Sequence, residues 1–296
     1  IVYQGDTEFA SSEQQRHLIQ TAPSPYDLKC LLRVMRDEMR HGWQMSHILV
    51  SHFGDTGKLE ARKLLERRAF KGTRLLGAFN QPLENWLEFF VYTAFIDRDG
   101  KYQLTMLHHS GFSPAANSMG PMLKEESFHL FTGQTGLTRV VKEGKVPPEI
   151  IQKYFNKWIS AAYDLFGKDR STSALRFYRW GFKGRFNEDK SLAPPRDLER
   201  LNEEARSLYA AEVQEILDGL NQMIPEGQSK LCLPDVRFNR KIGEFADKTF
   251  GADGRSLTGE EYRRHIQAAL PTAEDQLKLQ SIFKAGSWLS EVKDAA

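Results

Sequence analysis

Two glutamate–histidine pairs at helical spacing are the residues of this sequence best suited to chemistry. Glu38 stands three residues before His41 in "MRDEMRHGWQ", and Glu126 stands three residues before His129 in "LKEESFHLF". On a helix, positions i and i+3 share one face, so each pair can offer a carboxylate and an imidazole to one metal ion. Glu125 is not expected to be a ligand, because one residue turns roughly 100° around the helix axis. A single pair is more often an exposed ion pair worth about 0.2–0.5 kcal/mol, whereas two pairs in helix-like segments predict the halves of one site.

An acidic residue lies at a similar distance upstream of each pair. Glu8 precedes Glu38 by 30 residues, and Asp97 precedes Glu126 by 29 residues. In an antiparallel helix pair, residues that face each other at mid-height are separated by about one helix length plus a loop. The sequence therefore predicts that each half of the site has its own upstream carboxylate. Asp99 is the alternative to Asp97, which matches the spacing of the first half better.

The resulting ligand set contains four carboxylates and two imidazoles. Such a hard, oxygen-rich set suits iron or manganese, whereas structural zinc sites use cysteine and histidine in closed tetrahedral geometry. Helical bundles hold two iron ions with this combination of residues. Two metals that share carboxylates keep coordination positions open, which on Fe(II) indicates dioxygen chemistry. Buried carboxylates without a partner are costly, so bound metals are also expected to stabilise the fold.

The elements that must position these residues are predicted to be helices. Helical segments are expected at 6–20, from Ser24-Pro25 to Gly54, from Pro82, from Ser113-Pro114, at 147–166 and at 196–221. Prolines are well tolerated in the first turn of a helix, and strand-like alternation is scarce. We therefore predict an all-α protein built around a helical bundle, with a long connection at 168–195 and short helices and loops after residue 221.

The second of these helices carries a clear apolar pattern. Its apolar residues recur at spacings of three and four, which is typical of an amphipathic helix with a buried stripe. The residues of this stripe are Leu28, Leu31, Leu32, Met35, Met39 and Trp43. We expect the bundle core to occupy residues 1–166, with 167–296 as a helical and loop extension packed on it in one continuous domain.

The composition excludes several classes of protein. The chain of 296 residues carries a formal net charge of only +2, which does not favour nucleic-acid or membrane binding by bulk electrostatics. It has no run of about 18 apolar residues and no visible signal peptide. Two cysteines are too few for a disulfide framework, so a cytoplasmic location is expected. Because the chain begins with Ile1, we expect it to be part of a longer protein.

Several segments of the chain match a known family. "MRDEMRHGWQMSHIL", "MLKEESFHLFTG", "RFYRWGFKGRFNED" and "LCLPDVRFNRKIGEFA" resemble the oxygenase components of benzoyl-CoA 2,3-epoxidases, members of the ferritin-like di-iron family. The resemblance covers most of the chain and implies a ferritin-like four-helix bundle with additional C-terminal helices and loops. It implies that the iron ligands are Glu8, Glu38, His41, Asp97, Glu126 and His129. Glu38 and Glu126 are the expected catalytic residues, with Glu38 as a bridging carboxylate.

The resemblance also implies a reaction and partners. A separate iron–sulfur and flavin reductase would deliver electrons from NADPH, two iron ions would activate O2, and one oxygen atom would be added across the 2,3 bond of benzoyl-CoA. The chain itself shows no flavin or nicotinamide fingerprint. The alternatives are a ferritin-like ferroxidase, one subunit of a phenylacetyl-CoA epoxidase, and a metal-free helical interaction module. Either a monomer or a homodimer is compatible with the sequence.

Two basic segments are candidates for binding the phosphates of coenzyme A. The first, at residues 62–74, carries Arg62, Lys63, Arg67, Arg68, Lys71 and Arg74. The second combines cations with aromatic side chains and is the better candidate, because aromatic residues on a glycine-bearing loop can flank a flat ligand. Its expected substrate-binding residues are Arg176, Arg179, Trp180, Lys183 and Arg185. A solvated helix face and a loop packed by its own aromatics are the alternatives, and nucleic-acid binding is disfavoured by the net charge.

Overall fold

The described part of the chain is built of helices and loops. The computed structural model describes residues 1–183, 197–286, 288–290 and 292. Its α-helices are α1 (Val2–Gln15), α2 (Pro25–His52), α3 (Gly54–Glu66), α4 (Trp86–His108), α5 (Ser113–Glu143), α6 (Pro148–Leu165), α7 (Thr172–Arg179), α8 (Leu201–Asn221), α9 (Gly259–Ala269) and α10 (Ala273–Lys284). Short 3-10 helices are η1 (Arg16–Thr21), η2 (Ala69–Lys71) and η3 (Gly77–Asn80). The all-α prediction is confirmed.

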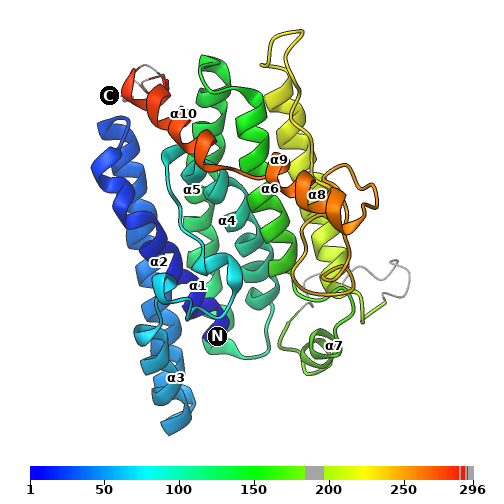
Figure 1. Ribbon diagram of the computed structural model, residues 1–296. Coiled ribbons are helices and arrows are strands. Elements are labelled where there is room, and N and C mark those ends of the chain that lie inside the picture. The colour runs from blue at the N-terminus through cyan, green and yellow to red at the C-terminus, as the bar shows by residue number, and fades with distance from the viewer. Residues whose placement is uncertain (184–196, 287, 291, 293–296) are drawn as a thin grey trace.

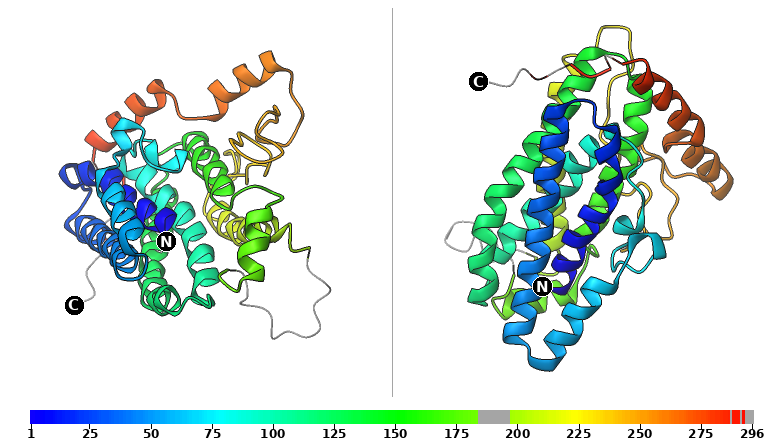
Figure 2. Two further views of the ribbon diagram at one scale, coloured as in Figure 1. Left: turned by 90° about the horizontal axis from the view of Figure 1, so that it is seen from below. Right: turned by 90° about the vertical axis from the view of Figure 1, so that its left-hand side faces the viewer.

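A ferritin-like bundle of α1, α2, α4 and α5 forms the centre of the protein (Figure 1). Within it, α1 packs against α2, α2 against α5, and α5 against α4. Helices α6 and α8 pack on α4, while α9 and α10 cross the outside of the molecule. The view along the bundle places α1 and α2 at one side and α6 and α8 at the other (Figure 2, left). Residues that are far apart in the sequence thus meet at mid-height between the four central helices.

Helix α4 is the most deeply buried helix of the bundle. Residues 86–99 are buried almost without interruption, because α5 covers one side of the helix and α6 with α8 covers the other. A helix that is apolar around most of its circumference belongs in such a position. Its close packing on α5 depends on glycine, since a Cβ on Gly136 would lie 2.1 Å from a ring carbon of Phe90. The missing side chain lets the two helices that carry Asp97 and Glu126 approach each other.

Helix starts follow local capping chemistry. The predicted start of α2 is confirmed, because the hydroxyl of Ser24 accepts a hydrogen bond of 3.1 Å from the backbone N–H of Asp27. The prediction that Pro82 opens the next helix is wrong. Asn85 caps α4 instead, accepting a hydrogen bond of 2.9 Å from the backbone N–H of Glu88. The first helix begins at Val2 rather than residue 6 and continues as η1.

Three further predictions about elements need correction. Helix α3 was not predicted, and α7 lies inside the segment 168–195 that was expected to be a plain connection. The charged helix predicted from residue 196 begins at Leu201. Helices α3 and α7 have only 13 and 8 residues, and helices shorter than about 12–15 residues are marginal without tertiary packing.

The predicted buried stripe of α2 is wrong for three of its residues. Leu32, Met39 and Trp43 are 46%, 39% and 52% exposed. The physical reason is that the inner face of α2 carries buried polar residues at mid-height, including Glu38 and His41. The apolar stripe is therefore rotated toward solvent there, although Leu31 is fully buried.

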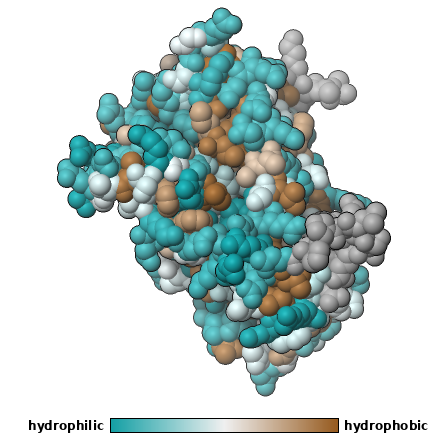
Figure 3. Space-filling view, turned by 90° about the vertical axis from the view of Figure 1, so that its right-hand side faces the viewer, coloured by the Kyte–Doolittle hydropathy of each residue, from teal (hydrophilic) through white to brown (hydrophobic). Residues whose placement is uncertain are grey.

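One face of the protein is largely polar. The face at the right-hand side of Figure 1 is mostly hydrophilic, with hydrophobic side chains gathered in smaller patches (Figure 3). Within the described ranges, none of the helices has the length and apolarity needed to cross a bilayer.

Candidate metal centre

The six residues predicted to bind metal lie together between the four central helices. Each of them is buried, with no more than 7% of its surface exposed. They are Glu8 on α1, Glu38 and His41 on α2, Asp97 on α4, and Glu126 and His129 on α5. The rings of the two histidines are 6.3 Å apart between their centroids. Four separate helices thus bring four carboxylates and two imidazoles to one place.

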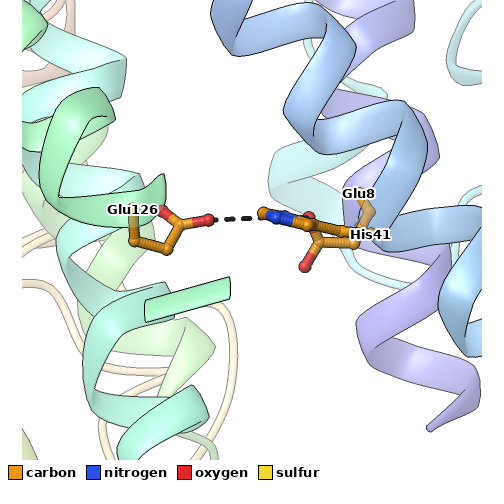
Figure 4. A group of neighbouring side chains, drawn as sticks. All are labelled: Glu8, His41 and Glu126. Carbon is orange, nitrogen blue, oxygen red and sulfur yellow. Dashed lines mark hydrogen bonds and ion pairs between the residues drawn. The ribbon is translucent and has the colours of Figure 1, made fainter. Parts of the chain in front are cut away.

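One half of the cluster joins α1, α2 and α5. Nδ1 of His41 lies 3.2 Å from Oε2 of Glu8 and 3.7 Å from Oε1 of Glu126. Figure 4 shows the carboxylate of Glu126 facing the His41 ring across the gap between the helices. The ligand atoms of these three residues all lie within 4.8 Å of one another, which is close enough for a single metal ion to bind all three.

The other half joins α2, α4 and α5. Nδ1 of His129 lies 3.4 Å from Oε2 of Glu126, 3.5 Å from Oε1 of Glu38 and 3.9 Å from Oδ2 of Asp97. Asp99 does not point to this cluster, since its Oδ1 accepts a hydrogen bond of 3.3 Å from the amide of Gln103. The geometry therefore brings Asp97, not Asp99, to the predicted ligands.

Glu126 is the carboxylate that belongs to both halves. One of its oxygens faces His41 and the other faces His129, and it is a member of both close-packed groups. A carboxylate in this position could contact a metal ion in each half. The expectation that Glu38 bridges stays a prediction, and Glu126 is the residue whose geometry matches that role.

Two acidic residues that were not predicted contact the outer sides of the histidines. Nε2 of His41 lies 2.7 Å from Oε2 of Glu125, and Nε2 of His129 lies 3.7 Å from Oδ2 of Asp37. Outer carboxylates of this kind orient metal-binding histidines and increase their basicity. The sequence signal is an acid directly before each glutamate of the two pairs, so that each acid contacts the histidine of the opposite helix.

Burial and mutual repulsion control the protonation of the cluster. Burial, together with the nearby charge of Glu8, raises the pKa of Glu38 well above its usual range. Burial and Glu126 do the same to the pKa of Asp97. Burial would also raise the pKa of Glu8, but its contact with His41 lowers the pKa below the ordinary value. The protein's own residues therefore do not stabilise the ionised form of all four carboxylates.

The cluster fits two iron ions. Oδ2 of Asp97 and both ring nitrogens of His129 are buried without a hydrogen-bond partner among the described residues. Unpaired buried polar atoms are costly and rare in folded proteins, so their presence calls for a ligand. Carboxylate oxygens and imidazole nitrogens in this number are the donors that di-iron bundles use. Two cations would bind Oδ2 of Asp97 and Nδ1 of His129, and they would neutralise the crowded carboxylates.

A cavity of about 400 Å³ leads from the cluster toward the surface. Glu8, Glu38, Asp97 and Glu126 line its inner end. Its walls are largely apolar, and they include Leu76, Phe79, Tyr92, Ile96, Leu104 and Phe166. Residues of the α7 region also line the cavity. They are Ser171, Phe177 and Lys183. The volume and the apolar lining are typical of a small-molecule site.

The predicted substrate-binding residues divide into two groups. Lys183 lines the cavity, where its ammonium group donates a hydrogen bond of 2.8 Å to the side-chain oxygen of Gln103. Arg176, Arg179 and Trp180 are exposed on or beside α7 and do not line the cavity. Arg185 lies outside the described residues. The basic segment at 62–74 does not line this cavity either.

The family of the protein follows from comparison with known sequences. The family of phenylacetic acid catabolic proteins matches residues 1–228, a range that includes all six clustered residues. The chain belongs to this family.

Two relatives of the chain have named activities. The chain is 38% identical to benzoyl-CoA oxygenase component B of Aromatoleum evansii, over 96% of the chain and 69% of the relative. It is 22% identical to one of the subunits of the 1,2-phenylacetyl-CoA epoxidase of Escherichia coli (strain K12), over 92% of the chain and 78% of the relative. The names of both relatives thus specify oxygen-transferring enzymes and aromatic coenzyme A thioesters.

Proposed function

We propose that this protein is the oxygenase component of a di-iron epoxidase that acts on benzoyl-CoA. It would bind two iron ions, use O2 to epoxidise the aromatic ring at the 2,3 position, and receive electrons from a separate NADPH-dependent reductase. The observation that carries the proposal is the cavity that joins the six-residue cluster to the surface near α7. The 38% identity to benzoyl-CoA oxygenase component B supports the choice of substrate.

The cavity suits an aryl thioester in size and lining. Its apolar walls at Phe79, Tyr92 and Ile96 would hold the ring close to the carboxylate cluster and keep water away from it. Lys183 also lines the cavity, where its ammonium group would donate to polar atoms of the thioester arm as it does to Gln103. A cavity of about 400 Å³ accommodates an acyl group and part of this arm. The nucleotide of coenzyme A would then lie outside the cavity.

The two iron ions would supply the activation of dioxygen. The protein's own residues would hold the metals and aim the substrate. Glu126 would connect the two halves, while Glu125 and Asp37 would orient the imidazoles of His41 and His129. The aromatic ring gains one oxygen atom, and two electrons with two protons convert the other oxygen atom to water. No flavin or nicotinamide fingerprint is visible in the chain, so a second protein must deliver the electrons.

The experiment that tests the proposal is product analysis after reconstitution with iron. The protein is incubated with O2, an electron donor, and either benzoyl-CoA or phenylacetyl-CoA. We expect oxygen uptake and an oxygenated thioester with benzoyl-CoA. A strong preference for phenylacetyl-CoA would identify that thioester, which the name of the 22% identical relative contains, as the substrate instead. Oxygen uptake without an oxygenated thioester would contradict the epoxidase proposal and favour a ferroxidase.

A further inference from the structure

A second groove lies on the outer face of α1, α2 and α3. It has a volume of about 420 Å³ and shares no lining residue with the cavity of the metal site. Helix α1 separates the two, because its Thr7 and Glu8 line the cavity whereas its Phe9 and Ser12 line the groove. Figure 2 (right) shows α1, α2 and α3 side by side on this face. A molecule in the groove would therefore not compete with a substrate in the cavity.

Large apolar side chains are exposed along this groove. Met39 and Trp43 of α2 are 39% and 52% exposed, and Leu65 and Phe70 are 39% and 71% exposed. Aromatic residues, methionine and arginine are enriched at the centres of protein–protein interfaces, where tryptophan and arginine often dominate the binding energy. Met39 and Trp43 belong to the apolar stripe that the sequence places in a protein interior. The composition of the groove is thus that of a surface covered by another protein.

The charge of the groove indicates an acidic partner. Within the described ranges, no ion pair joins Arg16 or Arg68 to a carboxylate. Among the described residues, the guanidinium of Arg68 donates to the backbone oxygens of Leu65 and Arg67, each at 2.6 Å. Glu13, the carboxylate that lines the groove, is already paired with Arg74 at 2.8 Å. The available charge is positive, so an acidic surface complements it.

Two aromatic residues that line the groove, Phe9 and Trp43, pack close to the metal site. The rings of Trp43 and Phe9 are in edge-to-face contact, with centroids 5.7 Å apart. Phe9 packs directly on the backbone of α2, because a Cβ on Gly42 would lie 2.8 Å from its ring. Phe9 follows Glu8 in the chain, and Gly42 follows His41. Two aromatic side chains in contact therefore lead from the surface to residues that adjoin the cluster.

We propose that this groove is the docking surface of the electron-donating protein. The inference rests on the proposed function, in which benzoyl-CoA, O2, two electrons and two protons give the epoxide and water. The partner is a redox protein with an acidic face around its cofactor. Arg16 and Arg68 bind that face, while Trp43 and Phe70 fill its apolar centre. Trp43 and Phe9 then provide the closest contact between the bound donor and the metal site.

The test compares Arg68→Glu and Trp43→Ala with the wild-type protein. The control is Lys145→Glu, which makes the same charge change at an exposed position outside the groove. The probe is the NADPH-dependent reductase that supports wild-type turnover. Calorimetry on iron-free protein measures its Kd, and oxygen uptake measures the reductase concentration that gives half-maximal rate. Reduced methyl viologen, a small mediator, replaces the reductase in a parallel assay.

We expect both groove variants to raise the Kd and the half-saturating reductase concentration at least tenfold. Turnover with methyl viologen should stay at the wild-type level, and Lys145→Glu should match the wild type in every assay. Unchanged reductase binding in the two variants would overturn the inference, as would an equal loss of activity with both donors. A wild-type dimer that Arg68→Glu dissociates, with reductase binding intact, would assign the groove to a second copy instead. If wild-type protein gives no oxygenated thioester with either donor, the proposed function itself fails.

Discussion

Nε2 of His41 lies 2.7 Å from Oε2 of Glu125, while Nδ1 of the same ring lies 3.2 Å from Oε2 of Glu8. The two nitrogens therefore face different carboxylates with different roles. With Nε2–H donating to Glu125, the lone pair of Nδ1 points to the interior of the cluster. On the other half, Oδ2 of Asp37 lies 3.7 Å from Nε2 of His129, on the outer side of that ring. The imidazoles are thus oriented by acids of the opposite helix.

From this relationship we predict that Glu125→Gln weakens iron binding about 10–100-fold. The amide keeps the size of the side chain but loses the charge that makes the imidazole a better ligand. Competition with an iron chelator measures the effect, and Glu260→Gln on the exposed face of α9 is the control. Equal iron affinity of Glu125→Gln and wild type would contradict the orienting role.

A second prediction concerns Glu38, whose pKa is raised by burial and by neighbouring carboxylates. Glu38→Gln should stabilise the iron-free protein by about 0.5–2 kcal/mol, because it removes a crowded acid at a site selected for binding rather than stability. The same variant should lose the stabilisation that iron gives the wild type. Thermal unfolding with and without iron measures both effects, with Glu66→Gln as the exposed control. A variant that is less stable than wild type without iron would disagree with the crowding argument.

A third prediction tests the close contact of α4 and α5. Gly136→Ala should lower the free energy of unfolding by about 1–3 kcal/mol, because its Cβ would overlap the ring of Phe90. That Cβ would lie only 2.1 Å from the nearest ring carbon. Gly219→Ala on α8 is the matched control, since no atom lies within 4 Å of its Cβ, and it should gain up to about 1 kcal/mol. Equal effects of the two substitutions would exclude close packing as the reason for Gly136.

A fourth prediction uses the buried ion pairs that hold the segment after α6. Asp169 contacts Arg206 at 2.6 Å and Arg240 at 3.5 Å. Burial would raise the pKa of Asp169, but the two guanidinium groups lower it below its ordinary value. Asp169→Asn should cost about 3–5 kcal/mol near pH 7, because it leaves the buried guanidinium of Arg206 without its carboxylate partner.

The pH dependence of this effect has a definite sign. A carboxyl group with a lowered pKa stabilises the fold above the ordinary carboxyl pKa, and the stabilisation is lost as the pH falls through the lowered value. The difference between wild type and Asp169→Asn should therefore be constant near neutrality and shrink below about pH 4. Denaturant titrations across this range measure it, with the exposed Asp253→Asn as control. A difference that grows on acidification would rule out the ion-pair explanation.

The sequence was sufficient to predict the helical class and the position of the cluster. Proline positions and apolar periodicity predict the helices, and on a helix a carboxylate and an imidazole at i and i+3 share one face. Asp97 could be chosen over Asp99 by its distance from Glu126, and the geometry agrees with that choice. That these residues bind iron stays a prediction.

What the sequence could not predict depends on contacts between helices. The helical spacing excludes Glu125 as a partner of His129 on its own helix, yet Glu125 contacts His41 of the neighbouring helix. Trp43 was placed in the core because periodicity cannot distinguish a stripe that packs inside from one that faces solvent or a partner. Pro82 does not begin α4. The side chain of Asn85, three residues later, caps the first turn of the helix.

The most direct test of the central claim is isotope analysis of the thioester after turnover under oxygen-18 gas. Iron-loaded protein is supplied with benzoyl-CoA and electrons, and the thioester is analysed by mass spectrometry. The account predicts a product that carries one labelled oxygen atom, formed by the wild type and lost in Glu126→Ala. Consumption of oxygen with oxidation of iron, but with an unlabelled thioester, would contradict it.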